Sequence, residues 1–131
     1  MDILVTNNPL VNEHFQGDFR VDFIDTDMLG ILSYVRDLVH KGHRLLTHPL
    51  SGSVKPNETP YKSVIVKDIP DKSDLQTGAK IHVETDPQSV CIIEECIFTA
   101  QKFPSREIPK QYLNDMQIVD LSLISGAKGK H

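Results

Sequence analysis

The sequence lacks the features that mark secreted and membrane proteins. It has two cysteines among 131 residues and no apolar run close to the roughly 20 residues that a membrane helix needs. Cys91 and Cys96 offer no disulfide framework and are typical of a reducing compartment. The chain starts with Met1-Asp2 and turns apolar at once, so we predict no signal peptide. We therefore expect a cytoplasmic protein without a membrane partner.

A surplus of basic residues is also missing. Lys and Arg number 14 against 18 Asp and Glu, for a formal net charge of -4. Nucleic-acid binders usually show the opposite balance, so we expect no nucleic-acid partner. The remaining composition, 39% hydrophobic and 24% charged, is typical of a globular protein. We predict a single domain at residues 1–125 and a flexible tail at 126–131.

Two classes of cofactor site have no support in the sequence. No G-x-x-x-x-G-K-[ST] or G-x-G-x-x-G motif is present, so a standard nucleotide loop is not expected. His40, His43 and His48 lie close together in the chain. However, a strand between the last two would hold them about 15 Å apart at ~3.3 Å per residue, too far for one ion. We predict no cofactor and no metal.

The first half of the chain alternates strand and helix patterns. Asn8 followed by Pro9 is typical of a helix start, and Gly17 and Gly42 are typical of helix ends. An apolar stripe beginning at Met28 recurs at helical spacing. The predicted elements are a buried strand at 3–6, a short helix at 9–16, a strand at 19–24, a helix at 28–41 and a strand at 43–47.

The second half is less strongly patterned. Residues 61–67 predict a fourth strand, whose direction stays open because no helix is predicted before it. Loop is expected from 68 to 84, and Asp86-Pro87 predicts the start of another helix. For 116–124 the apolar spacing fits a helix, but alternation at 119–123 fits a strand equally well. We leave both readings open.

Alternating elements of this kind predict an α/β fold. We expect a single three-layer domain, with a small, mainly parallel sheet of order about 2-1-3-4 and helices on both faces. Such sheets bind ligands beyond the carboxyl ends of the strands, where the strand order reverses. The loops at 6–9 and 47–61 would then be two walls of one crevice.

The loop at 47–61 is the main functional candidate. It is long, it is stiffened by three prolines, and loops of this length are often functional. The helix start after Pro9 favours an anion, and Lys55 could supply a countercharge. We predict that the crevice binds a small anionic or amino-acid-like ligand. The expected ligand-binding residues are Thr6, Asn7, Asn8, His48, Ser51, Gly52, Ser53 and Lys55, with Asn57, Glu58 and Thr59 bracing the loop.

Two other functions fit the same residues. One is an enzyme acting on a carbonyl or phosphate group, with His48 as acid or base and Lys55 stabilising charge. No G-x-S-x-G elbow is present, so His48 is the only catalytic candidate and we favour a non-catalytic protein. The other is an interaction module whose stiff loop docks on a partner. A homodimer is a further expectation, since a second copy could cover part of the last apolar stripe.

Three stretches resemble the GrdX family: VTNNPLV at 5–11, VRDLVHKGH at 35–43 and, above all, LLTHPLSGSVKPNETPYK at 45–62. The resemblance spans nearly the whole chain and is thinnest at 68–86. That family goes with the glycine, sarcosine and betaine reductase systems of amino-acid-fermenting anaerobic bacteria. The resemblance therefore implies a bacterial cytoplasmic accessory protein of that pathway, with reductase subunits as expected partners. It implies no reaction and no catalytic residues.

Overall fold

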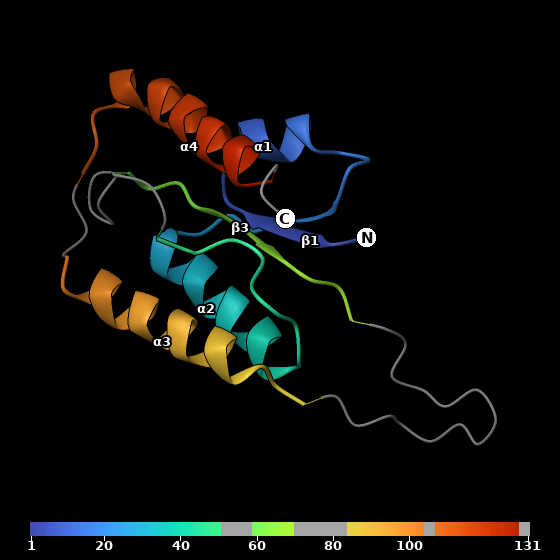
Figure 1. The fold of residues 1–131 in the computed structure, drawn as a ribbon. Coiled ribbons are helices and arrows are strands. Elements are labelled where there is room, and N and C mark those ends of the chain that lie inside the picture. Colours follow the sequence, from blue (N-terminus) through green and yellow to red (C-terminus); the bar gives the residue numbers. More distant parts are fainter. Residues whose placement is uncertain (51–58, 70–83, 104–106, 129–131) are drawn as a thin grey trace.

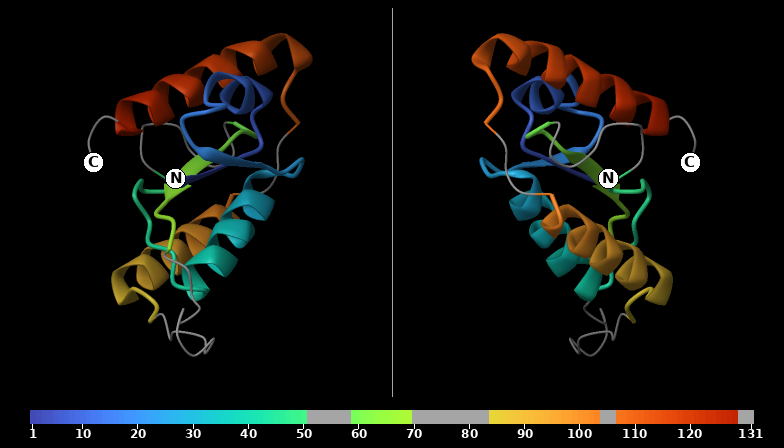
Figure 2. Two further views of the ribbon diagram at one scale, coloured as in Figure 1. Left: turned by 90° about the vertical axis from the view of Figure 1, so that its right-hand side faces the viewer. Right: turned by 90° about the vertical axis from the view of Figure 1, so that its left-hand side faces the viewer.

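A three-stranded sheet lies between two pairs of helices in a computed structural model of the chain (Figure 1). The structure describes residues 1–50, 59–69, 84–103 and 107–128. Helices α2 and α3 cover one face of the sheet, and α1 and α4 cover the other (Figure 2). The elements are β1 (Ile3–Thr6), α1 (Pro9–His14), β2 (Arg20–Phe23), α2 (Met28–His40), β3 (Ser63–Val66), α3 (Pro87–Gln101), the 3-10 turn η1 (Lys110–Tyr112) and α4 (Leu113–Lys128).

The strands β1 and β3 are buried on both faces. Ile3 and Val5 pack into the larger core with α2 and α3, whereas Leu4 packs into the smaller core with α1 and α4. In β3, Ile65 belongs to the smaller core and its two neighbours to the larger one. Successive side chains of a strand point to opposite faces, so a continuous apolar run is what a sheet covered on both sides requires.

Local signals place the helix starts as predicted. Asn8, Asp27 and Asp86 cap α1, α2 and α3, and in each case a side-chain oxygen accepts a backbone N–H of the first turn. The chain leaves α2 through Gly42, whose φ of 110° lies in the left-handed region that glycine adopts readily. Of the two readings left open for 116–124, the helix is correct, because this stretch lies within α4.

The sheet differs from the predicted one in strand number and direction, so the predicted fold class is wrong. The described residues form three strands, in the order β2-β1-β3, rather than four in the order 2-1-3-4. β1 pairs with β2 in parallel but with β3 antiparallel, so the sheet is mixed and not mainly parallel. β3 is the strand predicted at 61–67. The strand predicted at 43–47 is reduced to one isolated bridge, between Leu45 and Val66.

Side-chain hydrogen bonds explain why 43–47 is not a full strand. The Leu45 N–H donates to Ser89 Oγ at 3.0 Å, and Thr47 Oγ1 accepts from the Ile65 N–H at 3.0 Å. These bonds occupy backbone groups that a regular ladder would use, and only three backbone bonds join residues 44–47 to Ile65 and Lys67. An antiparallel neighbour of β1 also needs no crossover helix, in keeping with the absence of a helix pattern before 61–67.

Within the described residues no helix combines the length and apolar character that a membrane span requires. Helix α4 continues to Lys128, into the segment predicted as a tail, and 129–131 lie outside the described residues.

Two helical glycines give a matched test of the packing around α2. A Cβ on Gly30 would lie 2.8 Å from the Cβ of Thr26, whose carbonyl accepts a bond from the Asn7 side chain. We expect Gly30→Ala to lower the free energy of unfolding by about 1–3 kcal/mol, as overpacking does. Gly126→Ala in α4, where no atom lies within 4 Å, should instead raise it by up to about 1 kcal/mol. Urea denaturation measures both, and equal gains would contradict the packing of α2.

Candidate functional site

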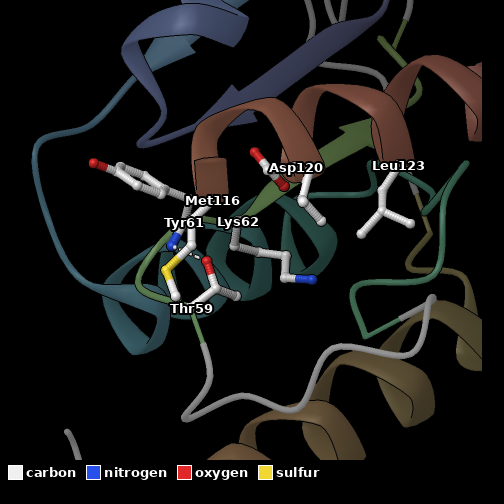
Figure 3. Close-up of a pocket in the computed structure, with 7 residues that line it drawn as sticks. Thr59, Tyr61, Lys62, Met116, Asp120 and Leu123 are labelled. Atoms are coloured by element: carbon white, nitrogen blue, oxygen red, sulfur yellow. Dashed lines mark hydrogen bonds between the residues drawn. The ribbon is translucent and has the colours of Figure 1, made fainter. Parts of the chain in front are cut away.

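A pocket of about 220 Å³ lies between α4 and the segment that leads into β3 (Figure 3). Pockets for drug-sized ligands measure about 300–1,000 Å³, so this one suits a smaller molecule. Its sides are apolar along α4 and polar along the incoming segment. The lining residues are Thr59, Tyr61, Lys62, Met116, Val119, Asp120 and Leu123.

A recess of about 10 Å³ shares three of these lining residues, Lys62, Asp120 and Leu123. A volume of this order holds about one water molecule. The recess is closed at its far side by Ser63 and Ile124, which belong to the core between α4 and the sheet. Lys62 and Asp120 therefore lie where the pocket meets the buried interior.

Lys62 presents a buried cation to the pocket. Only 8% of the residue is exposed, and its backbone N–H is fixed by a 2.8 Å bond to Asn7 Oδ1. Its side chain runs along the pocket, with the amine extending toward Leu123 (Figure 3). Burial lowers the pKa of Lys62, while the nearby charge of Asp120 acts in the opposite direction.

The amine of Lys62 has no counter-ion among the described residues. An ion pair requires an N–O distance of 4.0 Å or less, and no described carboxylate lies that close to it. Burial raises the pKa of the Cys96 thiol to about 11, so this thiol is uncharged at neutral pH and cannot balance the ammonium. Buried lysines are rare unless they are paired, which makes this one a candidate for function.

Asp120 presents a buried carboxylate to the same pocket. It is 6% exposed, and its Oδ2 accepts bonds from Ser63 Oγ at 2.7 Å and from Asn8 Nδ2 at 3.1 Å. Ser63 Oγ also lies 2.7 Å from Thr6 Oγ1. The carboxylate thus joins α4 to β3, to the end of β1 and to the start of α1. Its other oxygen, Oδ1, accepts no bond from a described residue.

The unpaired atoms of these two residues reach open space. Every side-chain nitrogen or oxygen of the described residues that is sealed from solvent has a hydrogen-bond partner. Lys62 Nζ and Asp120 Oδ1 have no partner among these residues, so neither atom can be sealed. Chemically, the pocket offers one ammonium donor and one carboxylate acceptor against an apolar wall. No group of three or more metal-ligating side chains occurs among the described residues.

The predicted wall at 6–9 supports the pocket from behind. Asn7 Nδ2 donates to the carbonyls of Thr26 and Pro60, each at 2.8 Å, and Asn7 Oδ1 holds Lys62. Thr6 and Asn8 belong to the Asp120 network. The structure therefore brings 6–9 beside the end of the 47–61 loop, but none of these three polar residues is among those that line the pocket. Their contact with a ligand stays a prediction.

The predicted wall at 47–61 is described only at its two ends. His48 is exposed, does not line the pocket, and accepts a bond from the Leu50 N–H at Nδ1, 3.1 Å away. Thr59 lines the pocket, and its Oγ1 accepts from the Tyr61 N–H at 3.2 Å, while its bracing role stays a prediction. The remaining predicted residues, Ser51, Gly52, Ser53, Lys55, Asn57 and Glu58, lie outside the described residues.

Lys62 and Asp120 escaped the sequence-based prediction of the site. A signal for both exists: Lys62 immediately precedes an apolar strand, and Asp120 stands among the apolar residues of α4. Charged side chains in such surroundings are either solvated or specially compensated, and only the packing of α4 on the sheet decides between these outcomes.

The family model for GrdX-like proteins matches residues 3–128. The chain belongs to the GrdX-like family. The resemblance predicted from the sequence is thereby confirmed, and both Lys62 and Asp120 fall within the part that the GrdX-like model covers. Comparisons with curated proteins and with solved structures gave no match.

The Asp120 network predicts a large effect of removing the carboxylate. Asp120→Ala leaves Ser63 Oγ without its acceptor at a buried position, and leaves Asn8 Nδ2 with only the Gln117 carbonyl, 3.0 Å away. We expect the free energy of unfolding to fall by about 2–4 kcal/mol, measured by urea denaturation. Ser122→Ala, at an exposed position of the same helix, should change it by less than about 0.5 kcal/mol. A loss below about 1 kcal/mol for Asp120→Ala would show that the network is not holding α4.

The lowered pKa of Lys62 predicts a pH-dependent penalty. Between its folded pKa and the unfolded value of about 10.4, the unfolded chain binds the extra proton, so wild-type stability rises with pH across that window. Lys62→Met removes the penalty, so we expect it to be more stable than wild type at neutral pH, with the difference shrinking toward pH 10.4. Lys67→Met, at an exposed lysine just beyond β3, is the control and should show no such trend. A difference that stays constant with pH would argue against a buried Lys62 ammonium.

Proposed function

We propose that this protein binds a small molecule with a carboxylate or another anionic group, in the pocket between α4 and the segment Thr59–Lys62. The observation that carries the proposal is the Lys62 ammonium, which is buried at the pocket wall without a counter-ion among the described residues. The anionic group of a ligand would balance this charge through a charge-assisted hydrogen bond. Binding would also favour the protonated amine, which burial disfavours in the protein without ligand.

The position of the pocket in the sheet supports the same conclusion. Asn7 ties Pro60 and Lys62 to the carboxyl end of β1, so the pocket lies at that end of the central strand. Open α/β sheets bind ligands beyond the carboxyl ends of their strands. Contacts from the loop residues Ser51, Ser53 and Lys55 remain proposed, and Lys62 carries the proposal without them.

Family membership supports the setting of this binding activity. The GrdX-like family suggests an association with glycine reductase systems, and hence a cytoplasmic accessory protein of amino-acid-fermenting bacteria. A small amino-acid-like ligand fits both that setting and a pocket of about 220 Å³. We favour binding over catalysis because His48, the candidate acid or base, is not among the residues that line the pocket.

One observation favours a second function, docking on a reductase subunit. Tyr112, Val119 and Leu123 recur at helical spacing on η1 and α4 and are 49%, 44% and 37% exposed. Adjacent to them, Ile118 is 57% exposed. Exposed apolar side chains that gather on one surface are typical of interaction sites, whereas isolated ones are not.

Ligand-dependent thermal stability separates these functions. We expect at least one of acetate, glycine, sarcosine and phosphate to stabilise the wild type, by about 1.4 kcal/mol at ten times its Kd. Lys62→Met should remove the shift, because the anion loses its partner, and Lys67→Met should keep it. A shift that survives in Lys62→Met would refute the proposed site. An unshifted wild type that binds a purified reductase subunit would favour docking instead.

A further inference from the structure

The charges facing the pocket are of both signs. Lys62, from the segment before β3, and Asp120, from α4, are both among the residues that line it (Figure 3). Both residues are buried, at 8% and 6% exposure, yet they form no ion pair within 4.0 Å. Asp120 is nevertheless near enough for its charge to raise the pKa of Lys62 against the effect of burial.

Opposite charges that are buried and adjacent normally form an ion pair, because their attraction compensates for the hydration that burial removes. Here the backbone of Lys62 is fixed by Asn7, and the Oδ2 atom of Asp120 is fixed by Ser63 and Asn8. The protein therefore holds the two groups apart, and neither Nζ nor Oδ1, which have no partner among the described residues, is sealed from solvent. A molecule between them would be met by a donor on one side and an acceptor on the other.

From this arrangement we infer that the ligand is a small zwitterion, whose carboxylate pairs with Lys62 and whose ammonium donates to Asp120 Oδ1. This inference rests on the proposed binding function and adds the second anchor. Two oppositely charged ends satisfy both buried groups at once, whereas a simple anion leaves Asp120 unpaired and adds a like charge near it. The complex is neutral overall at the anchors, which suits a poorly hydrated site.

Pocket volume and lining limit the size and character of this zwitterion. At about 220 Å³ the pocket is smaller than the roughly 300–1,000 Å³ of pockets that take drug-sized ligands. Met116, Val119 and Leu123 give the pocket an apolar side that offers no partner for further charged groups. The ligand class is thus a short amino acid, with a hydrogen or small apolar substituent, rather than one with an acidic or basic side chain.

The test compares zwitterions with molecules that carry only one of the two charges. Glycine, β-alanine and γ-aminobutyrate vary the distance between the charges, while acetate, propionate and the matching alkylamines each remove one end. NMR titrations of the full chain give the dissociation constants. We expect the best zwitterion to bind at least about tenfold more tightly than its matched carboxylate, and the amines to bind most weakly.

Asp120→Asn is the informative variant, because its amide oxygen can still accept from Ser63 and Asn8 while the charge is lost. It should weaken zwitterion binding about tenfold and leave acetate binding within about twofold, so that the preference between the two disappears. Lys62→Met should abolish binding of both. Asp115→Asn, at an exposed position of α4, should alter neither.

The outcomes distinguish the two levels of the account. If carboxylates bind as tightly as zwitterions, or if Asp120→Asn leaves the preference intact, the zwitterion inference is overturned while anion binding stands. If Lys62→Met binds all these ligands as wild type does, the pocket is not the binding site and both are overturned. If no probe binds at all, we would conclude that water bridges the two charges. Both the zwitterion inference and the proposed anion binding would then be overturned.

Discussion

The packing of α4 on the sheet centres on a buried carboxylate, Asp120, with Gln117 adding bonds to Asn8 and Tyr61. The core beneath this helix is small, with five buried members, and only Ile124 comes from α4 itself. Asp120 supplies what the apolar contacts do not, by accepting bonds from Ser63 at the start of β3 and from Asn8, the N-cap of α1. These bonds fix the position of α4 on the sheet. The apolar stripe through Met116 and Val119 then lines the pocket instead of packing against the sheet.

Under the proposed function, the same residues would serve both stability and ligand binding. Asp120 fixes α4 with one oxygen and offers the other to the pocket. Asn7 in turn fixes the segment that carries Lys62, so the polar residues after β1 set the geometry without lining the space. Buried charged groups that lower the stability of the fold are most readily explained when a bound ligand pairs with them. Removing the charge of Lys62 should then favour the fold while harming binding.

Local sequence signals sufficed where the structure is local. Asn8-Pro9 and Gly42 mark helix boundaries because capping and left-handed φ are decided by adjacent residues. The strand expected at 43–47 failed because a short apolar stretch becomes a strand only if its backbone groups find a ladder, and Ser89 takes one of them from a distant helix. The same limit applied to the site: the predicted residues Asn7 and Thr59 lie beside the pocket, where ligand contact stays a prediction, whereas burial of Lys62 and Asp120 depends on where α4 packs.

The titration of the Lys62 amine tests the central claim most directly. NMR of lysine-labelled protein, with Lys62 assigned through Lys62→Met, would follow this amine with and without saturating acetate. The account predicts that Lys62 titrates at a lower pH than the other lysines in the free protein, and that the bound anion raises its pKa. A Lys62 amine that titrates together with the exposed lysines, and does not respond to acetate, would contradict a buried ammonium that pairs with a ligand anion.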